Sequence, residues 1–133
     1  MEGPRQKPLV LILAREFASA LAMPMFVADA EGNLVFYNEP AEEILGKSYA
    51  EIGEASAEEW TALFNPETPD GQPLSFRERP TGIALAERRP AHAQLRITGL
   101  DGRTRQISVT ALPLFAREHD FVGVLAVFWE HGE

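Results

Sequence analysis

The sequence contains no cysteine and little positive charge. Without cysteine there is no disulfide framework, no thiolate nucleophile and no Cys-based metal site, and the absence fits a reducing cytoplasm. The 12 Lys and Arg residues face 20 Asp and Glu residues, which gives a net charge of −8. A phosphate backbone or an anionic bilayer would mostly repel such a chain, so neither nucleic acid nor a membrane surface is an expected partner.

Long apolar runs are also missing, since none approaches the roughly 20 residues of a membrane span. The N-terminal run from Leu9 to Ala14 is interrupted by Arg15 and Glu16, which makes it too short for a signal peptide. A different pattern is present there, because apolar residues recur every four positions after Pro8. This spacing predicts an amphipathic helix that ends before Pro24, and its stripe is Leu9, Leu13, Phe17 and Leu21.

Catalytic motifs are absent as well. There is no G-x-S-x-G elbow, H-E-x-x-H pair or glycine-rich phosphate loop. The adjacent carboxylates Glu42-Glu43 and Glu58-Glu59 would point in different directions on a helix, and Asp29 is expected to cap backbone amides of a turn. The histidines do not cluster with other metal ligands; they are His92, His119 and His131. We therefore expect neither an enzyme nor a metal site.

The first half of the chain contains a predicted hairpin followed by short helices. Strands are expected at Met25–Asp29 and Leu34–Tyr37, on either side of a turn that contains Gly32. Asn38 is a suitable N-cap for a helix that Gly46 ends. Two Ser-x-x-Glu capping boxes then predict further short helices, at Ser48 with Glu51 and at Ser56 with Glu59.

The second half contains a turn-rich loop, one more helix and three predicted strands. Proline at position 80 suits the first turn of a helix that extends to about Arg89. Alternating residues then predict an antiparallel hairpin around Asp101-Gly102. The final stretch from Phe121 to Trp129 is apolar at every position, which indicates a central strand covered on both faces. The order of elements predicts an α+β domain.

The ordered set of motifs resembles a PAS domain over about residues 20–130. The residues that carry the likeness are Asp29, Gly32, Asn38, Ala41, Ile44-Leu45-Gly46, Asp70–Leu74, Arg79-Pro80, Asp101-Gly102 and Val122-Gly123-Val124. The resemblance implies a five-stranded antiparallel sheet, with short helices on its concave face and the N-terminal amphipathic helix on the other. It also implies a sensory and dimerising role in bacterial signalling.

The resemblance places a small-ligand pocket between the short helices and the sheet. Counting alternation along the strands and helical spacing, the candidates for its lining are Phe26, Ala28, Phe36, Ile44, Leu45, Trp60, Leu63, Phe64, Ile83, Ile107, Val109, Val124 and Ala126. The alternative is that these side chains simply fill the space as core.

Residues that are absent from this chain exclude some of the cofactors that members of the family bind. Flavin-adduct and thioester-chromophore members need a cysteine, which excludes both types here. Haem-binding members place an axial histidine on the long helix, and Thr81 to Arg89 contains none. The nearest substitute, His92, is expected on the polar face of its strand. We expect no cofactor of these kinds, and the identity of any ligand stays open.

A homodimer is the expected assembly. The outer face of the last strand, formed by Phe121, Leu125, Val127 and Trp129, would be a bare apolar patch unless the N-terminal helix covers it. The dimer-interface candidates are Leu9, Leu13, Phe17, Leu21, Leu125, Val127 and Trp129. The alternative is that the helix is an intramolecular lid on a monomer.

The chain divides into three expected parts: a flanking helix at 1–23, the PAS domain at 24–130 and a tail at 131–133. Family members often continue with an Asp-x-Thr signature, where this chain has Glu130-His131-Gly132-Glu133. Either the chain is an excised input module or it signals by noncovalent association with an effector. The sequence thus predicts a non-enzymatic, cytoplasmic sensory module that binds a small apolar ligand, and the alternative is a purely structural dimerisation domain with a filled core.

Overall fold

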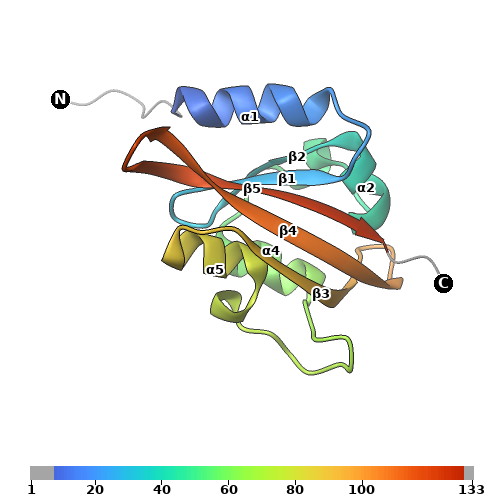
Figure 1. Cartoon of the computed structure of the whole chain (residues 1–133). Helices are drawn as coiled ribbons and strands as arrows, with labels where there is room; N and C mark the ends of the chain where they lie inside the picture. Colours follow the sequence, from blue (N-terminus) through green and yellow to red (C-terminus); the bar gives the residue numbers. More distant parts are fainter. Residues whose placement is uncertain (1–7, 131–133) are drawn as a thin grey trace.

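The computed structural model describes residues 8–130, so the predicted tail at 131–133 and residues 1–7 of the flanking segment lie outside the described residues. Five strands form one antiparallel sheet, with α1 on one side and the other helices on the opposite side (Figure 1). The elements are α1 Leu9–Ser19, β1 Met25–Asp29, β2 Leu34–Tyr37, α2 Glu39–Leu45, α3 Tyr49–Ile52, α4 Ala57–Phe64, η1 Phe76–Glu78, α5 Pro80–Glu87, β3 Ala91–Thr98, β4 Thr104–Arg117 and β5 Asp120–Glu130.

The strand order is β2-β1-β5-β4-β3, which places the last strand at the centre of the sheet. This position explains why β5 is apolar at every residue from Phe121 to Trp129, since both of its faces are covered over most of their length. The α+β class and the antiparallel five-stranded sheet predicted from the sequence are confirmed. Within residues 8–130, no helix has the length and apolar character needed to cross a bilayer.

The helix ends follow the capping signals in the sequence. The Asn38 side chain accepts from the amide of Ala41 and starts α2, and Gly46 ends α2 in the left-handed conformation at φ 88°. Both Ser-x-x-Glu pairs form reciprocal capping boxes at the starts of α3 and α4. Because these signals are local, they fix the short helices before any tertiary contact is made.

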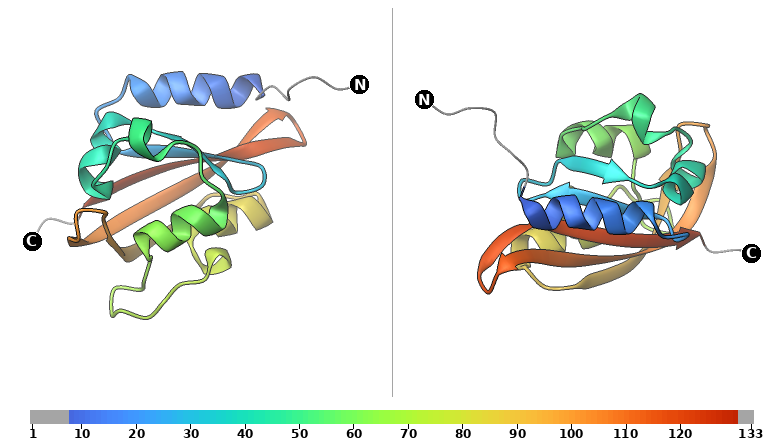
Figure 2. Two further views of the ribbon diagram at one scale, coloured as in Figure 1. Left: turned by 180° about the vertical axis from the view of Figure 1, so that it is seen from behind. Right: turned by 90° about the horizontal axis from the view of Figure 1, so that it is seen from above.

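Two hydrophobic clusters lie on opposite faces of the sheet. The larger inner cluster fills the space between the sheet and helices α2, α4 and α5. The smaller outer cluster lies between the sheet and α1. In Figure 2 the helix forms a separate layer beside the sheet in the left view and lies in front of the strands in the right view. Adjacent residues on β1 belong to different clusters, so Phe26 faces inward while Val27 faces α1.

Helix α1 covers the outer face, but with a different stripe from the one predicted. The residues buried against the sheet are Leu11, Ala14 and Ala18. A Cβ on Gly123 would lie 2.8 Å from the Leu11 side chain and 2.3 Å from the Ala28 carbonyl oxygen, so small residues let the helix come close. The predicted stripe faces away, and the exposed fractions are 67% for Leu9, 57% for Leu13 and 55% for Phe17.

A β-bulge in β2 reverses the predicted direction of Phe36. Phe26 pairs with Tyr37 and Ala28 with Leu34, so Val35 is one residue more than the ladder needs. Phe36 therefore packs with the outer cluster, and Tyr37 takes the inward position. The prediction that Phe36 points inward is wrong, because strict alternation does not survive an extra residue.

A second irregularity reverses Phe121 at the other end of the sheet. Leu114 pairs with Gly123 and Phe115 with Phe121, which leaves Val122 as the extra residue on β5. Phe121 thus packs against the inner cluster, and Val122 belongs to the outer one. Phe121 had been expected on the outer face with Leu125, and the bulge explains the difference.

Besides capping α2, the Asn38 side chain forms hydrogen bonds that connect three elements. Its Oδ1 accepts from the amides of Met25 (3.0 Å) and Ala41 (3.2 Å). Its Nδ2 donates to the carbonyl oxygens of Ala18 and Met23, both at 2.8 Å. The side chain is only 1% exposed. One amide group therefore joins the end of α1, the start of β1 and the start of α2.

Candidate functional site

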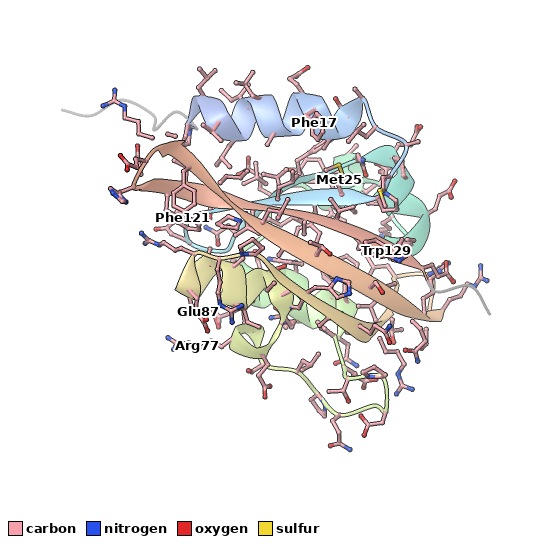
Figure 3. The ribbon with its side chains drawn as sticks, viewed as in Figure 1. Phe17, Met25, Arg77, Glu87, Phe121 and Trp129 are labelled. Atoms are coloured by element: carbon pink, nitrogen blue, oxygen red, sulfur yellow. The ribbon has the colours of Figure 1, made fainter. Side chains whose placement is uncertain are left out.

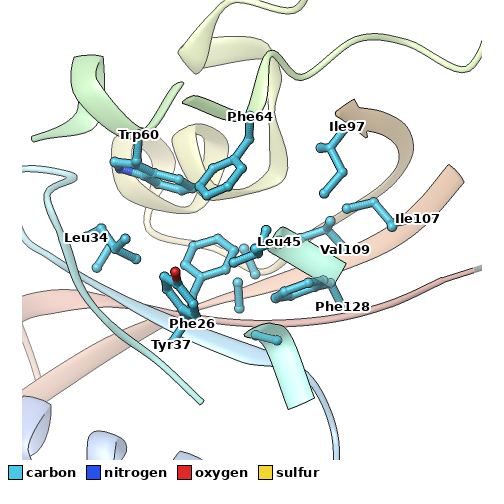
Figure 4. Close-up of a cluster of buried hydrophobic side chains, with 14 of the residues drawn as sticks. Phe26, Leu34, Tyr37, Leu45, Trp60, Phe64, Ile97, Ile107, Val109 and Phe128 are labelled. Atoms are coloured by element: carbon cyan, nitrogen blue, oxygen red, sulfur yellow. The ribbon is translucent and has the colours of Figure 1, made fainter. Parts of the chain in front are cut away.

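An apolar cavity of about 50 Å³ lies inside the inner cluster, between the sheet and helices α4 and α5. Figure 4 shows Trp60 and Phe64 of α4 facing residues of the sheet across the inner cluster. Six of the predicted pocket residues line this cavity: Phe26, Leu45, Trp60, Phe64, Ile107 and Val109. Sequence spacing therefore brought the central part of the site together.

The other predicted pocket residues lie elsewhere. Four are buried in the inner cluster without lining the cavity; they are Ala28, Ile44, Val124 and Ala126. Phe36 lies on the outer side of the sheet, Leu63 is exposed on α4, and Ile83 is half-buried outside the lining. Leu63 and Ile83 do lie on helices, as predicted from their spacing. They do not line the cavity, because each short helix presents only one narrow face to the sheet.

Aromatic rings in contact with one another form one wall of the cavity. The Phe26 and Trp60 ring centroids are 4.9 Å apart in an edge-on arrangement, and Phe128 lies 5.9 Å from Phe26. Trp60 donates from Nε1 to the carbonyl oxygen of Gly32 in the β1–β2 turn at 3.1 Å. The hydrogen bond holds the indole in one orientation, so Trp60 is the part of this wall with a defined position.

Arg79, just before α5, is the one charged side chain in the lining, and the sequence analysis did not select it as a site residue. It is 5% exposed, although it carries a guanidinium group. Its Nη2 donates to Thr61 Oγ1 at 2.8 Å and its Nε to the Ser75 carbonyl at 3.4 Å. The guanidinium carbon lies 4.7 Å from the Phe76 ring centroid and 6.0 Å from that of Trp60. Burial lowers the Arg79 pKa to about 10, so the group is still charged at neutral pH.

A second, open groove lies on the other side of Arg79. It has a volume of about 680 Å³ and is bordered by α4, η1, α5 and the β1–β2 turn. Three further charged side chains line it: Glu31, Glu58 and Arg77. Arg77 is labelled in Figure 3 on the side of the molecule opposite α1. Since Arg79 and Thr61 appear in the groove lining and Arg79 also borders the cavity, Arg79 is part of the wall between them.

The predicted interface residues divide between two places. Leu125 and Val127 belong to the outer cluster beneath α1. The α1 stripe is exposed, and Figure 3 labels Phe17 on the helix. Trp129 is 36% exposed near the end of β5, where its ring centroid lies 6.0 Å from that of His92. The interface candidates therefore do not form one continuous surface in the single chain.

His92 lies on the exposed side of β3, where its Nδ1 is 2.8 Å from Thr110 Oγ1. It does not line the cavity. Among residues 8–130, no three side chains of the His, Cys, Asp and Glu types come together in a way that could hold a metal ion.

The sequence model described as the PAS fold matches residues 13–129, which is most of the chain. The chain belongs to the PAS family. Among proteins of curated function, none matches the sequence.

Solved PAS structures have the same architecture. The PAS domain of BvgS from Bordetella pertussis is 20% identical, with a TM-score of 0.62 over 92% of this chain and 86% of that one. The PAS domain of nitrogen regulation protein NR(II) from Vibrio parahaemolyticus is 16% identical, with a TM-score of 0.64 over 90% and 98%. The LOV protein of Rhodobacter sphaeroides is 16% identical, with a TM-score of 0.71 over 94% and 69%. At these identities the likeness concerns the fold alone.

The large cofactors of PAS proteins do not fit the cavity as it stands. Sites for drug-sized ligands have volumes of roughly 300–1,000 Å³, whereas this PAS cavity has about 50 Å³. The inward side chains of Phe26, Trp60, Phe64 and Phe128 line the cavity and limit it to this volume, which is far smaller than a flavin or a haem requires.

Proposed function

We propose that this PAS domain is a non-enzymatic, cytoplasmic sensory and protein-interaction module of bacterial signal transduction. A small, largely apolar ligand occupies the cavity between the short helices and the sheet. The observation that carries the proposal is the cavity itself, because it lies among aromatic and aliphatic side chains at the place where the family positions its pockets. Apolar cavities of this kind stay dry and accept small apolar molecules.

Strands β1 and β5 connect the cavity on one face of the sheet to helix α1 on the other face. Phe26 and Phe128 line the cavity, while the neighbouring residues Val27 and Val127 contact the outer cluster under α1. A ligand that moves the two rings changes the shape of the strands, and α1 rests on the opposite face of the same strands. The position of α1 is therefore the proposed output.

The output acts on association between molecules. The exposed stripe on α1 presents three large apolar side chains, Leu9, Leu13 and Phe17, in one line along the helix. Large apolar side chains that are exposed together on one face of a small domain are typical of an interaction surface. We propose that two copies pair through this stripe to form a homodimer, and that a signalling effector responds to the change in pairing.

The test identifies the small molecules released from the purified protein and compares them with those released from a variant whose cavity is filled. Val109→Ile adds one methylene to the cavity wall, and Val127→Ile makes the same change on the outer side of β5 as the matched control. Filling all of the 50 Å³ would stabilise the empty protein by about 1 kcal/mol, at roughly 24 cal/mol per Å³. Denatured samples of the wild-type protein and both variants are analysed by mass spectrometry.

The proposal expects a reproducible small molecule in the wild-type protein and in Val127→Ile, at a reduced level in Val109→Ile. Neutral apolar probes should raise the melting temperature of the wild-type protein and have less effect on Val109→Ile. If no molecule is recovered from any of the three proteins and no apolar probe changes their melting temperatures, the sensory function is wrong.

A second function is favoured by the small size of the cavity. A volume of about 50 Å³ leaves the inner cluster mostly filled, which suits a structural dimerisation domain without a ligand. That function predicts that Val109→Ile is more stable and associates as the wild-type protein does. Sedimentation of the wild-type protein and the variant, with and without the probes, distinguishes the two functions.

A further inference from the structure

Arg79 is a buried cation without an acidic partner in the described part of the chain. Its hydrogen-bond acceptors are a hydroxyl group and a backbone carbonyl, which are both neutral. No carboxylate of residues 8–130 lies within 4.0 Å of its guanidinium nitrogens. Removing a charge from water costs several kcal/mol unless an opposite charge compensates for it.

The guanidinium group has hydrogen-bonding capacity left over. An arginine has five N–H groups, and the two recorded bonds use one at Nε and one at Nη2. No described residue accepts a hydrogen bond from Nη1. The rings of Phe76 and Trp60 flank the group, and the cavity and the groove lie on either side of it. The free donors are thus held in place at the boundary between an apolar interior and an opening to solvent.

Resting on the proposed ligand-binding function, we propose that Arg79 recognises the ligand, and that the ligand is a small amphipathic carboxylate with a short hydrocarbon tail. The carboxylate pairs with the guanidinium group of Arg79 in a charge-assisted contact, and the tail lies among Phe26, Trp60 and Phe128 in the cavity. The carboxylate supplies the missing counter-charge, and the tail replaces empty space.

The size and charge of the surroundings narrow the ligand further. A cavity of about 50 Å³ accepts a tail of only a few carbon atoms without rearrangement. Glu31 and Glu58 line the groove beyond Arg79, with Arg77 as the other cation there. These two carboxylates repel a second negative charge on the ligand, so a monoanion is favoured over a dianion.

The experiment compares isosteric probes on the wild-type protein. Butyrate and butyramide have the same shape and differ in charge, while acetate has the charge without the tail. Binding is measured by calorimetry and by the change in melting temperature. We expect butyrate to bind at least about tenfold more tightly than butyramide, as a charge-assisted hydrogen bond implies, and acetate to bind more weakly than butyrate.

Two variants test the residue itself. Arg79→Met removes the charge and keeps an apolar chain of similar length, so it should lose the preference for butyrate over butyramide. Thr61→Val keeps the charge and removes one hydrogen-bond partner of Arg79, so it should retain the preference. If Arg79→Met does not fold, the comparison of isosteres on the wild-type protein decides alone.

The outcomes separate this inference from the function on which it rests. Equal binding of butyrate and butyramide to the wild-type protein would overturn the role of Arg79 and leave the apolar ligand site intact. A preference for butyrate that persists in Arg79→Met would overturn it as well. If no probe binds, charged or neutral, the ligand-binding function fails together with the inference.

Discussion

Replacing Asn38 with alanine should destabilise the protein by about 3 kcal/mol. The substitution removes four hydrogen bonds, two accepted by Oδ1 and two donated by Nδ2, from a side chain that is 1% exposed. Each such bond contributes about 1 kcal/mol, and the groups that lose their partner stay buried. The Ala18 carbonyl oxygen keeps a hydrogen bond in the variant, because it also accepts from the Leu21 amide. The expected loss of stability is therefore smaller than the cost of leaving four buried groups without a partner.

The measurement is urea unfolding followed by far-ultraviolet circular dichroism, with the free energy of unfolding extrapolated to water. The loss corresponds to a fall in melting temperature of about 10 °C for a domain of this size. Asn33→Ala is the control, since its side chain makes one hydrogen bond to Asp29 in the partly exposed hairpin turn. The control should lose less than about 1 kcal/mol.

The variant Asn38→Asp separates capping from the attachment of α1. Aspartate keeps the acceptor for Met25 and Ala41, but it cannot donate to the carbonyl oxygens of Ala18 and Met23. Relative to the wild-type protein, the increase in the hydrogen-exchange rate should therefore be larger at the α1 amides than at the α2 amides. A loss below about 1 kcal/mol in Asn38→Ala, or equal exchange in α1 and α2 of Asn38→Asp, would refute the reasoning.

Three further predictions follow from other contacts. Phe17→Glu should reduce self-association in sedimentation experiments, whereas Ser19→Glu, which adds the same charge on the same helix, should not; equal association of both variants would argue against the stripe. Gly123→Ala should destabilise the protein by at least about 1 kcal/mol in urea unfolding and loosen α1, because the new Cβ would lie 2.3 Å from the Ala28 carbonyl oxygen; unchanged stability would contradict that. Hydrogen bonds from Ser75 lower the Glu78 pKa from its usual 4.5, so this carboxylate stabilises the fold at neutral pH and loses that effect as the pH falls below 4.5. Glu78→Gln should therefore unfold with a weaker pH dependence on the acid side, and an unchanged profile would show that these hydrogen bonds do not affect stability.

The local elements were predictable because local signals decide them. Strands β1 and β2 have the predicted bounds, since alternation and an Asx turn specify both within a few residues. The caps at Asn38, Ser48 and Ser56 formed for the same reason. The central position of β5 followed from its composition alone.

Which side of an element faces the core was harder to predict than where the element lies. A β-bulge, or the choice between two apolar stripes on a helix, is decided by tertiary packing. Helix α1 has apolar residues on two sides, and the sequence period alone favoured the one that begins at Leu9. The sheet selected Leu11, Ala14 and Ala18 instead, because small side chains allow the closer approach. Phe36 was misplaced by one extra residue in a four-residue strand.

The candidate site was predicted in its centre and missed at its edge. Spacing on α4 and alternation on β4 brought Trp60, Phe64 and Val109 to the cavity. Arg79 was missed because a charged residue before a helical proline is usually exposed. Its burial depends on contacts with Thr61 and Trp60 of α4 and with the Phe76 ring of η1, and no local pattern encodes that arrangement.

The extra residue at Val35 gives the outer face of the hairpin one more side chain than the pairing with β1 requires. Deleting that valine would leave Leu34 opposite Ala28, Phe36 opposite Val27 and Tyr37 opposite Phe26, so the strand would alternate without interruption and both rings would keep their present faces. The Tyr37 hydroxyl would still donate to the Lys47 carbonyl oxygen inside the domain. Length variation at this position would thus change the surface that faces α1 and spare the interior in a single genetic event.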